Sequence, residues 1–143
     1  MSVSKITFDA IVSGGELDLT VTLDSQVIFQ SQIGEQPQQV QAVLDDSQAG
    51  DHELTLILSG KLPEHTKLNH LGEIESDRLL KISNITLDGL DAQQVFLANS
   101  IYCHNHNGTT DDVTEPFYGI MGCNGTVTMR FVTPTYIWFL KKS

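Results

Sequence analysis

The sequence predicts an all-β fold, an antiparallel β-sandwich of the jelly-roll type. Residues Glu16–Leu23 carry an apolar side chain at every second position, with acids and threonines between them. The same alternation returns at His52–Ser59 and at Thr126–Phe131. Because successive side chains of a strand point to opposite faces, this pattern places one face in a core and the other in water. A closed barrel is the alternative architecture.

The first half of the chain contains five expected strands. Each is an alternating or short apolar segment bounded by Gly, Pro, Asp or Ser, the residues that favour turns. These strands are Ser4–Val12, Glu16–Leu23, Val27–Gln30, Gln39–Leu44 and His52–Ser59. Glycines in the turn at 13–15 supply the positive φ that a tight connection requires. The residues that we predict to lie in the core are Leu19, Val21, Leu54, Leu56 and Leu58.

A long polar segment, residues 60–77, then interrupts the pattern. It shows no periodicity, and connections of this length are uncommon and often functional. Further strands are expected at Arg78–Leu87, Gln94–Tyr102 and Thr126–Phe131, with a last one after Pro134 that runs through Trp138. The one candidate for a helix is a single turn at Leu90–Gln94.

Length and charge limit the possible partners. A chain of 143 residues is expected to form one domain over residues 1–143. Eighteen acids against eight bases give a net charge of −10, which argues against a nucleic-acid partner because phosphates are bound by clustered Lys and Arg. No run approaches the roughly 18 apolar residues of a membrane span, and the first residues lack the apolar region of a signal peptide. We therefore expect neither a membrane partner nor secretion.

Short motifs give no indication of catalysis. The sequence contains no Gly-x-Ser-x-Gly, no His-Glu-x-x-His and no phosphate-binding glycine loop, so we predict no catalytic residue and no enzyme. The two cysteines, Cys103 and Cys123, are not arranged as Cys-x-x-Cys. Two reduced thiols are expected of a protein made in a cytoplasm, and a disulfide is the alternative.

Two loops contain candidate metal ligands. Asp45, Asp46 and Asp51 offer oxygen atoms that suit calcium, although the spacing is not that of an EF-hand. Imidazole and carboxylate groups also occur together in a second loop, which contains His104, His106, Asp111 and Asp112. That combination suits zinc or another transition metal. The alternative for both loops is a set of solvated side chains that only shape turns.

Aromatic residues gather near the C-terminus. Tyr136, Trp138 and Phe139 belong to a run of five large apolar residues that, as a strand, would be apolar on both faces. Such a strand is covered by its own domain or lies in an interface, and we predict an interface at these three residues. A sugar-stacking surface is the alternative, with Tyr118 as a candidate ligand-binding residue.

Part of the chain resembles a known family. Ile6–Ala10, the turn and strand at 13–19, and the short strand Val27–Phe29 resemble the opening of the calcium-dependent xylan-binding modules of carbohydrate-binding families 36 and 60. The resemblance continues through 50–56 and 80–89, so residues 1–93 form the part similar to a carbohydrate-binding module. It implies a jelly roll of binding type, calcium as a cofactor, a glycan ligand, and Glu16 as an acid that matches the family pattern.

Residues 94–143, which we expect to form a C-terminal strand extension, resemble extensions of virion proteins from large tailed bacteriophages, notably those of cyanobacteria. Together the two resemblances imply a non-catalytic structural or adhesion protein of the virion, made in the host cytoplasm. Its place would be a capsid decoration, the neck or a tail fibre. Its partners would be other copies of itself as a homo-oligomer, other virion proteins, or a cell-surface glycan. The alternative function is a calcium-dependent carbohydrate-binding module.

Overall fold

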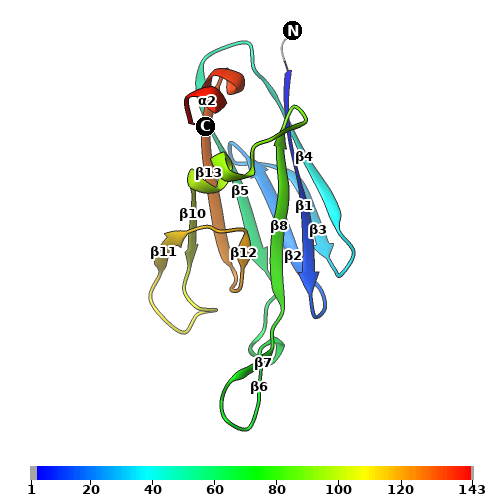
Figure 1. Cartoon of the computed structure of the whole chain (residues 1–143). Coiled ribbons are helices and arrows are strands. Elements are labelled where there is room, and N and C mark those ends of the chain that lie inside the picture. The colour runs from blue at the N-terminus through cyan, green and yellow to red at the C-terminus, as the bar shows by residue number, and fades with distance from the viewer. Residues whose placement is uncertain (1–2, 143) are drawn as a thin grey trace.

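The computed structural model, which describes residues 3–142, is a β-sandwich of two antiparallel sheets (Figure 1). The strand order is β12–β8–β1–β4 in one sheet, with β9 beside β8, and β11–β10–β13–β5–β2–β3 in the other. The prediction of an all-β jelly-roll sandwich is confirmed.

The strand bounds follow the turn residues of the sequence. The first sheet contains β1 (Val3–Ser13), β4 (Gln38–Asp45), β8 (Leu79–Leu87), β9 (Leu90–Asp91) and β12 (Ile120–Met121). The second contains β2 (Leu17–Leu23), β3 (Gln26–Ile33), β5 (Gly50–Ser59), β10 (Ser100–His104), β11 (Val113–Pro116) and β13 (Gly125–Thr133). The remaining elements are the 3₁₀ turn η1 (Pro63–His65), the hairpin strands β6 (Lys67–Leu68) and β7 (Ile74–Ser76), and the helices α1 (Gln93–Ala98) and α2 (Thr135–Lys142).

The core lies between the inner faces of the two sheets. Apolar residues of β1, among them Ile6 and Phe8, alternate inward on one side. The predicted core residues of β2 and β5 form the other side and are all at most 2% exposed: Leu19, Val21, Leu54, Leu56 and Leu58. Burying a side chain of this kind contributes about 1.5–3 kcal/mol. The packing of the two inner faces against each other therefore accounts for much of the stability of the sandwich.

The segment at 60–77 is more ordered than its sequence suggests. It contains η1 and the two-stranded hairpin β6–β7, which projects beyond the end of the sandwich (Figure 1). We call residues 62–76 the finger. Lys67 pairs with Ser76, and Leu68 pairs with Ile74.

The strand predicted through Trp138 is wrong, because this segment forms helix α2. Pro134 has no N–H to continue a sheet ladder, and the Trp138 N–H donates to the Pro134 carbonyl in helical fashion at 3.2 Å. A short apolar run suits either a helix or a strand, so periodicity alone did not distinguish them. The strand predicted at Gln94–Tyr102 is likewise replaced in its first half by α1.

Candidate binding cleft

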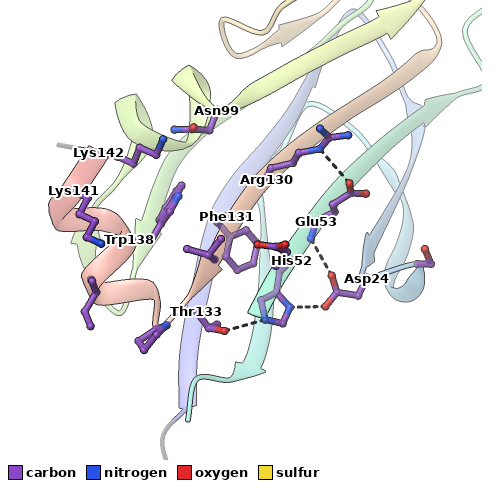
Figure 2. Close-up of a pocket in the computed structure, with 15 residues that line it drawn as sticks. Asp24, His52, Glu53, Asn99, Arg130, Phe131, Thr133, Trp138, Lys141 and Lys142 are labelled. Atoms are coloured by element: carbon purple, nitrogen blue, oxygen red, sulfur yellow. Dashed lines mark hydrogen bonds and ion pairs between the residues drawn. The ribbon is translucent and has the colours of Figure 1, made fainter. Parts of the chain in front are cut away.

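A cleft of about 980 Å³ lies between α2 and the adjoining ends of β5 and β13 (Figure 2). The turn between β2 and β3 supplies Asp24, β5 supplies Asp51 and Glu53, and β13 supplies Arg130. Lys141 and Lys142 come from α2, and Asn99 is the residue that follows α1. Segments distant in the sequence thus meet at one end of the sandwich.

The charge of the cleft differs from that of the whole chain. Its lining includes three acids, Asp24, Asp51 and Glu53, and three bases, Arg130, Lys141 and Lys142. The chain as a whole has a net charge of −10. Glu53 and Arg130 face each other on paired strands, with 3.1 Å between Arg130 Nε and Glu53 Oε1. The cleft therefore presents donors and acceptors side by side without a strong field of either sign.

His52 organises one wall of the cleft. Its Nδ1 lies 2.7 Å from Asp24 Oδ2, and its ring stacks on Phe131 with 5.5 Å between the ring centroids. The Glu53 N–H donates to Asp24 Oδ1 at 2.9 Å. Burial alone raises the pKa of Asp24, but the hydrogen bonds from His52 and Glu53 outweigh it, so this pKa lies below its usual value. Asp24 is thus held as a carboxylate in one orientation.

Thr133, His52 and Asp24 form a chain of hydroxyl, imidazole and carboxylate, but the arrangement does not activate a nucleophile. His52 Nε2 lies 3.2 Å from Thr133 Oγ1, while the Thr133 hydroxyl donates at 2.6 Å to the Gln48 carbonyl. The hydroxyl proton is therefore not directed at the imidazole. Thr133 is also only 3% exposed, out of reach of a substrate. The chain of contacts positions Asp24 rather than supporting acyl transfer.

Helix α2 and the end of β13 supply the apolar part of the cleft. Trp138 is 5% exposed and packs against Phe96 and Phe131, with 5.2 Å and 6.0 Å between ring centroids, which fixes the helix on the sandwich. Ile137 and Val132 remain 50% and 37% exposed and line the cleft. The cleft therefore combines this aliphatic surface with polar side chains that come from α2, such as Lys141, and from the facing strands (Figure 2).

Of the first set of predicted calcium ligands, Asp51 alone lines the cleft. Asp45 accepts hydrogen bonds from the hydroxyl and N–H of Ser47, which hold its pKa below the usual value. Asp46 accepts from the N–H of Thr135, the first residue of α2, and from the hydroxyl of Ser4. Asp46 therefore anchors the start of α2, an interaction that also suits the helix dipole.

The second set of predicted ligands lies at the other end of the sandwich. His104 pairs with Gly125 at one end of β13, whereas the first set adjoins Thr133 at its other end. His104 Nε2 lies 2.5 Å from Glu115 Oε2, and its Nδ1 accepts from the His106 N–H. The carboxylates of this set, Asp111 and Asp112, are exposed. Within residues 3–142, no three His, Cys, Asp or Glu side chains are grouped to hold a metal ion.

The other predicted site residues also lie apart from one another. Glu16 is at the turn before β2, where its carbonyl accepts from Arg78 Nη1 at 3.1 Å. Tyr118 precedes β12 and is 82% exposed. Of the predicted interface residues, Tyr136 is 59% exposed, Trp138 is buried in the core and Phe139 is partly buried. Cys103 and Cys123 are free thiols, and burial raises the pKa of Cys123.

Sequence reasoning did not anticipate His52, Glu53, Asn99, Arg130 or Lys141 as site residues. A polar residue at an inward position of an alternating strand, such as His52 between Asp51 and Glu53, is the one signal that marks the region. Among the described residues, no helix is long and apolar enough to cross a membrane.

The fold and the cleft define the class of protein as an antiparallel β-sandwich with an open cleft at one end. In structure the chain is similar to the selenomethionine form of vCBM60, from work on two families of calcium-dependent carbohydrate-binding modules linked by circular permutation. The TM-score is 0.55 and the identity 13%, over 88% of this chain and 89% of that chain. A second similar structure is vCBM60 in complex with galactobiose, with a TM-score of 0.49 and 14% identity over 87% of this chain and 96% of that chain. No protein-family model and no curated protein matches the sequence.

Proposed function

We propose that this protein is a non-catalytic glycan-binding module and that the cleft beside α2 is its binding site. The observation that carries the proposal is the balanced set of three acids and three bases next to exposed aliphatic surface. A neutral sugar has hydroxyl groups that donate and accept, and C–H faces that pack on apolar side chains. The cleft offers both kinds of contact and does not select for a charged ligand.

The rigidity of the cleft also supports this proposal. The ring of His52 is fixed by Asp24, Thr133 and Phe131, and α2 is fixed by Trp138. Side chains that are held before binding lose less conformational entropy when a ligand arrives. The shared fold with a carbohydrate-binding module gives further support.

A glycan array, followed by calorimetry with the glycans that it identifies, tests the proposal. Arg130→Ala and Glu53→Ala each remove one polar group of the cleft and are expected to weaken binding about tenfold. Glu64→Ala, an exposed acid of the finger, is the matched control and is expected to bind like the wild type. Failure to bind any glycan, or binding that Arg130→Ala leaves unchanged, would contradict the proposed site.

Calcium and the virion setting are further parts of the proposal. Calcium is supported by the fold shared with a calcium-dependent module, and Asp51 is the predicted ligand that already lines the cleft. The setting in a tailed-phage virion is supported by the resemblance of residues 94–143 and by the exposed apolar finger, which suits a protein that assembles. Mass spectrometry of purified particles, with and without this gene product, tests the setting.

A further inference from the structure

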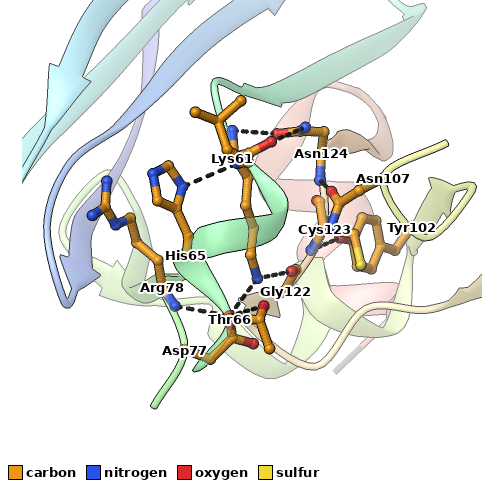
Figure 3. A network of polar contacts seen from close by, with 11 residues as sticks. Lys61, His65, Thr66, Asp77, Arg78, Tyr102, Asn107, Gly122, Cys123 and Asn124 are labelled. Atoms are coloured by element: carbon orange, nitrogen blue, oxygen red, sulfur yellow. Dashed lines mark hydrogen bonds and ion pairs between the residues drawn. The ribbon is translucent and has the colours of Figure 1, made fainter. Parts of the chain in front are cut away.

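The finger is anchored by a buried polar network at its base (Figure 3). Lys61 Nζ donates to the Gly122 carbonyl and lies 2.7 Å from Asp77 Oδ1, with the Lys61 side chain 1% exposed. The Thr66 hydroxyl donates to the same Asp77 oxygen at 2.7 Å. The backbone of Lys61 also exchanges two hydrogen bonds of 2.9 Å with the Asn124 side chain. The two ends of the finger are therefore joined to each other and to the β12–β13 turn.

Beyond this base, the finger exposes apolar side chains. Leu68, Leu71 and Ile74 are 57%, 70% and 65% exposed. Leu68 and Ile74 pair across the hairpin, and Leu71 lies in the turn between the two strands. A two-stranded hairpin alone is marginally stable in water, so a finger that is anchored at its base and exposes apolar residues fits a docking element.

An apolar groove of about 400 Å³ lies at the same end of the sandwich. It is lined by Ile11, Leu79 and Ile120, and its charged residues are Lys81 and Glu35. Leu79 follows the base of the finger by two residues, so the groove and the finger are neighbours. Among the described residues, the finger of the same chain supplies none of the groove lining.

We propose that two copies of this chain form a dimer in which each finger docks in the groove of the other copy. The charges are complementary as well as the apolar surfaces. Glu73 and Glu75 flank Ile74 in the finger, and the positively charged residue that lines the groove is Lys81. Glu35 gives the groove a second charge, opposite in sign to that of Lys67 in the finger. A finger and a groove on the same end allow both contacts to form at once under twofold symmetry, which is the arrangement most common among oligomers.

This interface differs from the one predicted at the C-terminal residues, and it is independent of glycan binding, because the cleft lies at the opposite end of the strands. The contact is small and the chain is strongly acidic, so a dimer that dissociates in the micromolar range is expected.

Sedimentation velocity of the full chain across the micromolar range tests the proposal. Leu71→Asp in the finger and Ile120→Asp in the groove are each expected to raise the dissociation constant at least about tenfold. Leu90→Asp changes an aliphatic residue that is 50% exposed at the other end of β8, and it is expected to dimerise like the wild type. Circular dichroism checks that each variant is folded, and Leu71→Asp should bind glycan normally.

A charge exchange makes the test specific. Changing Glu73 and Glu75 to Lys lowers the overall negative charge and so weakens the general repulsion between two chains. The change is nevertheless expected to weaken the dimer, because the two introduced lysines would lie near Lys81 of the other copy. Adding Lys81→Glu to that variant should restore dimerisation. A wild-type chain that stays monomeric would overturn the proposal, as would a dimer that is insensitive to Leu71→Asp and to the charge exchange.

Discussion

Lys61 and Asp77 form an ion pair across the base of the finger, with 2.7 Å between Nζ and Oδ1. The side chains are 1% and 19% exposed, so both charges are largely removed from water. Such a pair is maintained only when further hydrogen bonds satisfy it, and here Gly122, Thr66 and the Arg78 N–H supply them. The pair therefore specifies where the finger leaves the sandwich more than it adds net stability.

A double-mutant cycle on this pair tests that interpretation. Lys61→Met leaves the Asp77 carboxylate without its cation and is expected to lower the free energy of unfolding by about 3 kcal/mol. Lys61→Met combined with Asp77→Leu is expected to cost less than the two single changes together, because no buried charge is left unpaired. Urea denaturation measures all four proteins. Strict additivity would show that the two side chains do not interact.

Acid stability should depend on Asp77. Burial raises its pKa. The hydrogen bonds from Lys61, Thr66 and Arg78 and the charge of Lys61 lower the pKa by more than burial raises it, so the pKa of Asp77 in the folded protein is below the unfolded value. The stabilisation is then complete above the unfolded pKa of about 4 and is lost as the pH falls through the folded pKa. Melting temperatures between neutral and acidic pH should fall less steeply for Asp77→Asn than for the wild type. Parallel curves would contradict the assignment.

Trp138 should matter for stability, whereas its neighbour Tyr136 should not. Trp138 is 5% exposed between Phe96 and Phe131, so Trp138→Ala is expected to cost about 3–5 kcal/mol. Tyr136 is 59% exposed, and Tyr136→Ala should change the free energy of unfolding by less than about 0.5 kcal/mol. Chemical denaturation of both variants gives the comparison. Similar costs for the two changes would argue against helix α2 as described.

Tyr102 should ionise later than a free tyrosine. Its hydroxyl donates to the Cys123 carbonyl at 2.5 Å and accepts from the Cys123 N–H at 2.9 Å, and burial raises its pKa to about 12. An ultraviolet titration should show one tyrosine with this late ionisation, and it should be absent in Tyr102→Phe. That variant is also expected to lose about 1–3 kcal/mol of stability because both backbone groups lose their partner.

Calcium binding can be tested by thermal melting with calcium and with a chelator. A cation held by the native state alone raises stability by about 2.7 kcal/mol at a hundred times its dissociation constant, so the melting temperature should rise with calcium. Asp51→Asn is expected to abolish the rise if this residue of the cleft is a ligand. Equal midpoints in calcium and in chelator would exclude a structural calcium site.

The alternating strands could be predicted because their signal is local. Leu19, Val21, Leu54, Leu56 and Leu58 are buried as expected, since a strand with one wet face must place every second side chain inward. The antiparallel sandwich follows from several such strands separated by turns. The segment at 136–140 shows where this reasoning stops, because a short apolar run carries no periodicity that separates a helix from a strand.

Tertiary structure alone decided the cleft and the finger. Asp24, His52 and Arg130 meet because β13 pairs with β5 and β5 with β2, and strand order is not encoded in the pattern of any one strand. Lys61 and Asp77 are likewise ordinary charged residues in the sequence and become a buried pair only when the finger closes. The sequence thus determined which faces are apolar, because burial depends on each residue and its near neighbours. Which polar groups come together was decided by long-range pairing, because it depends on the whole topology.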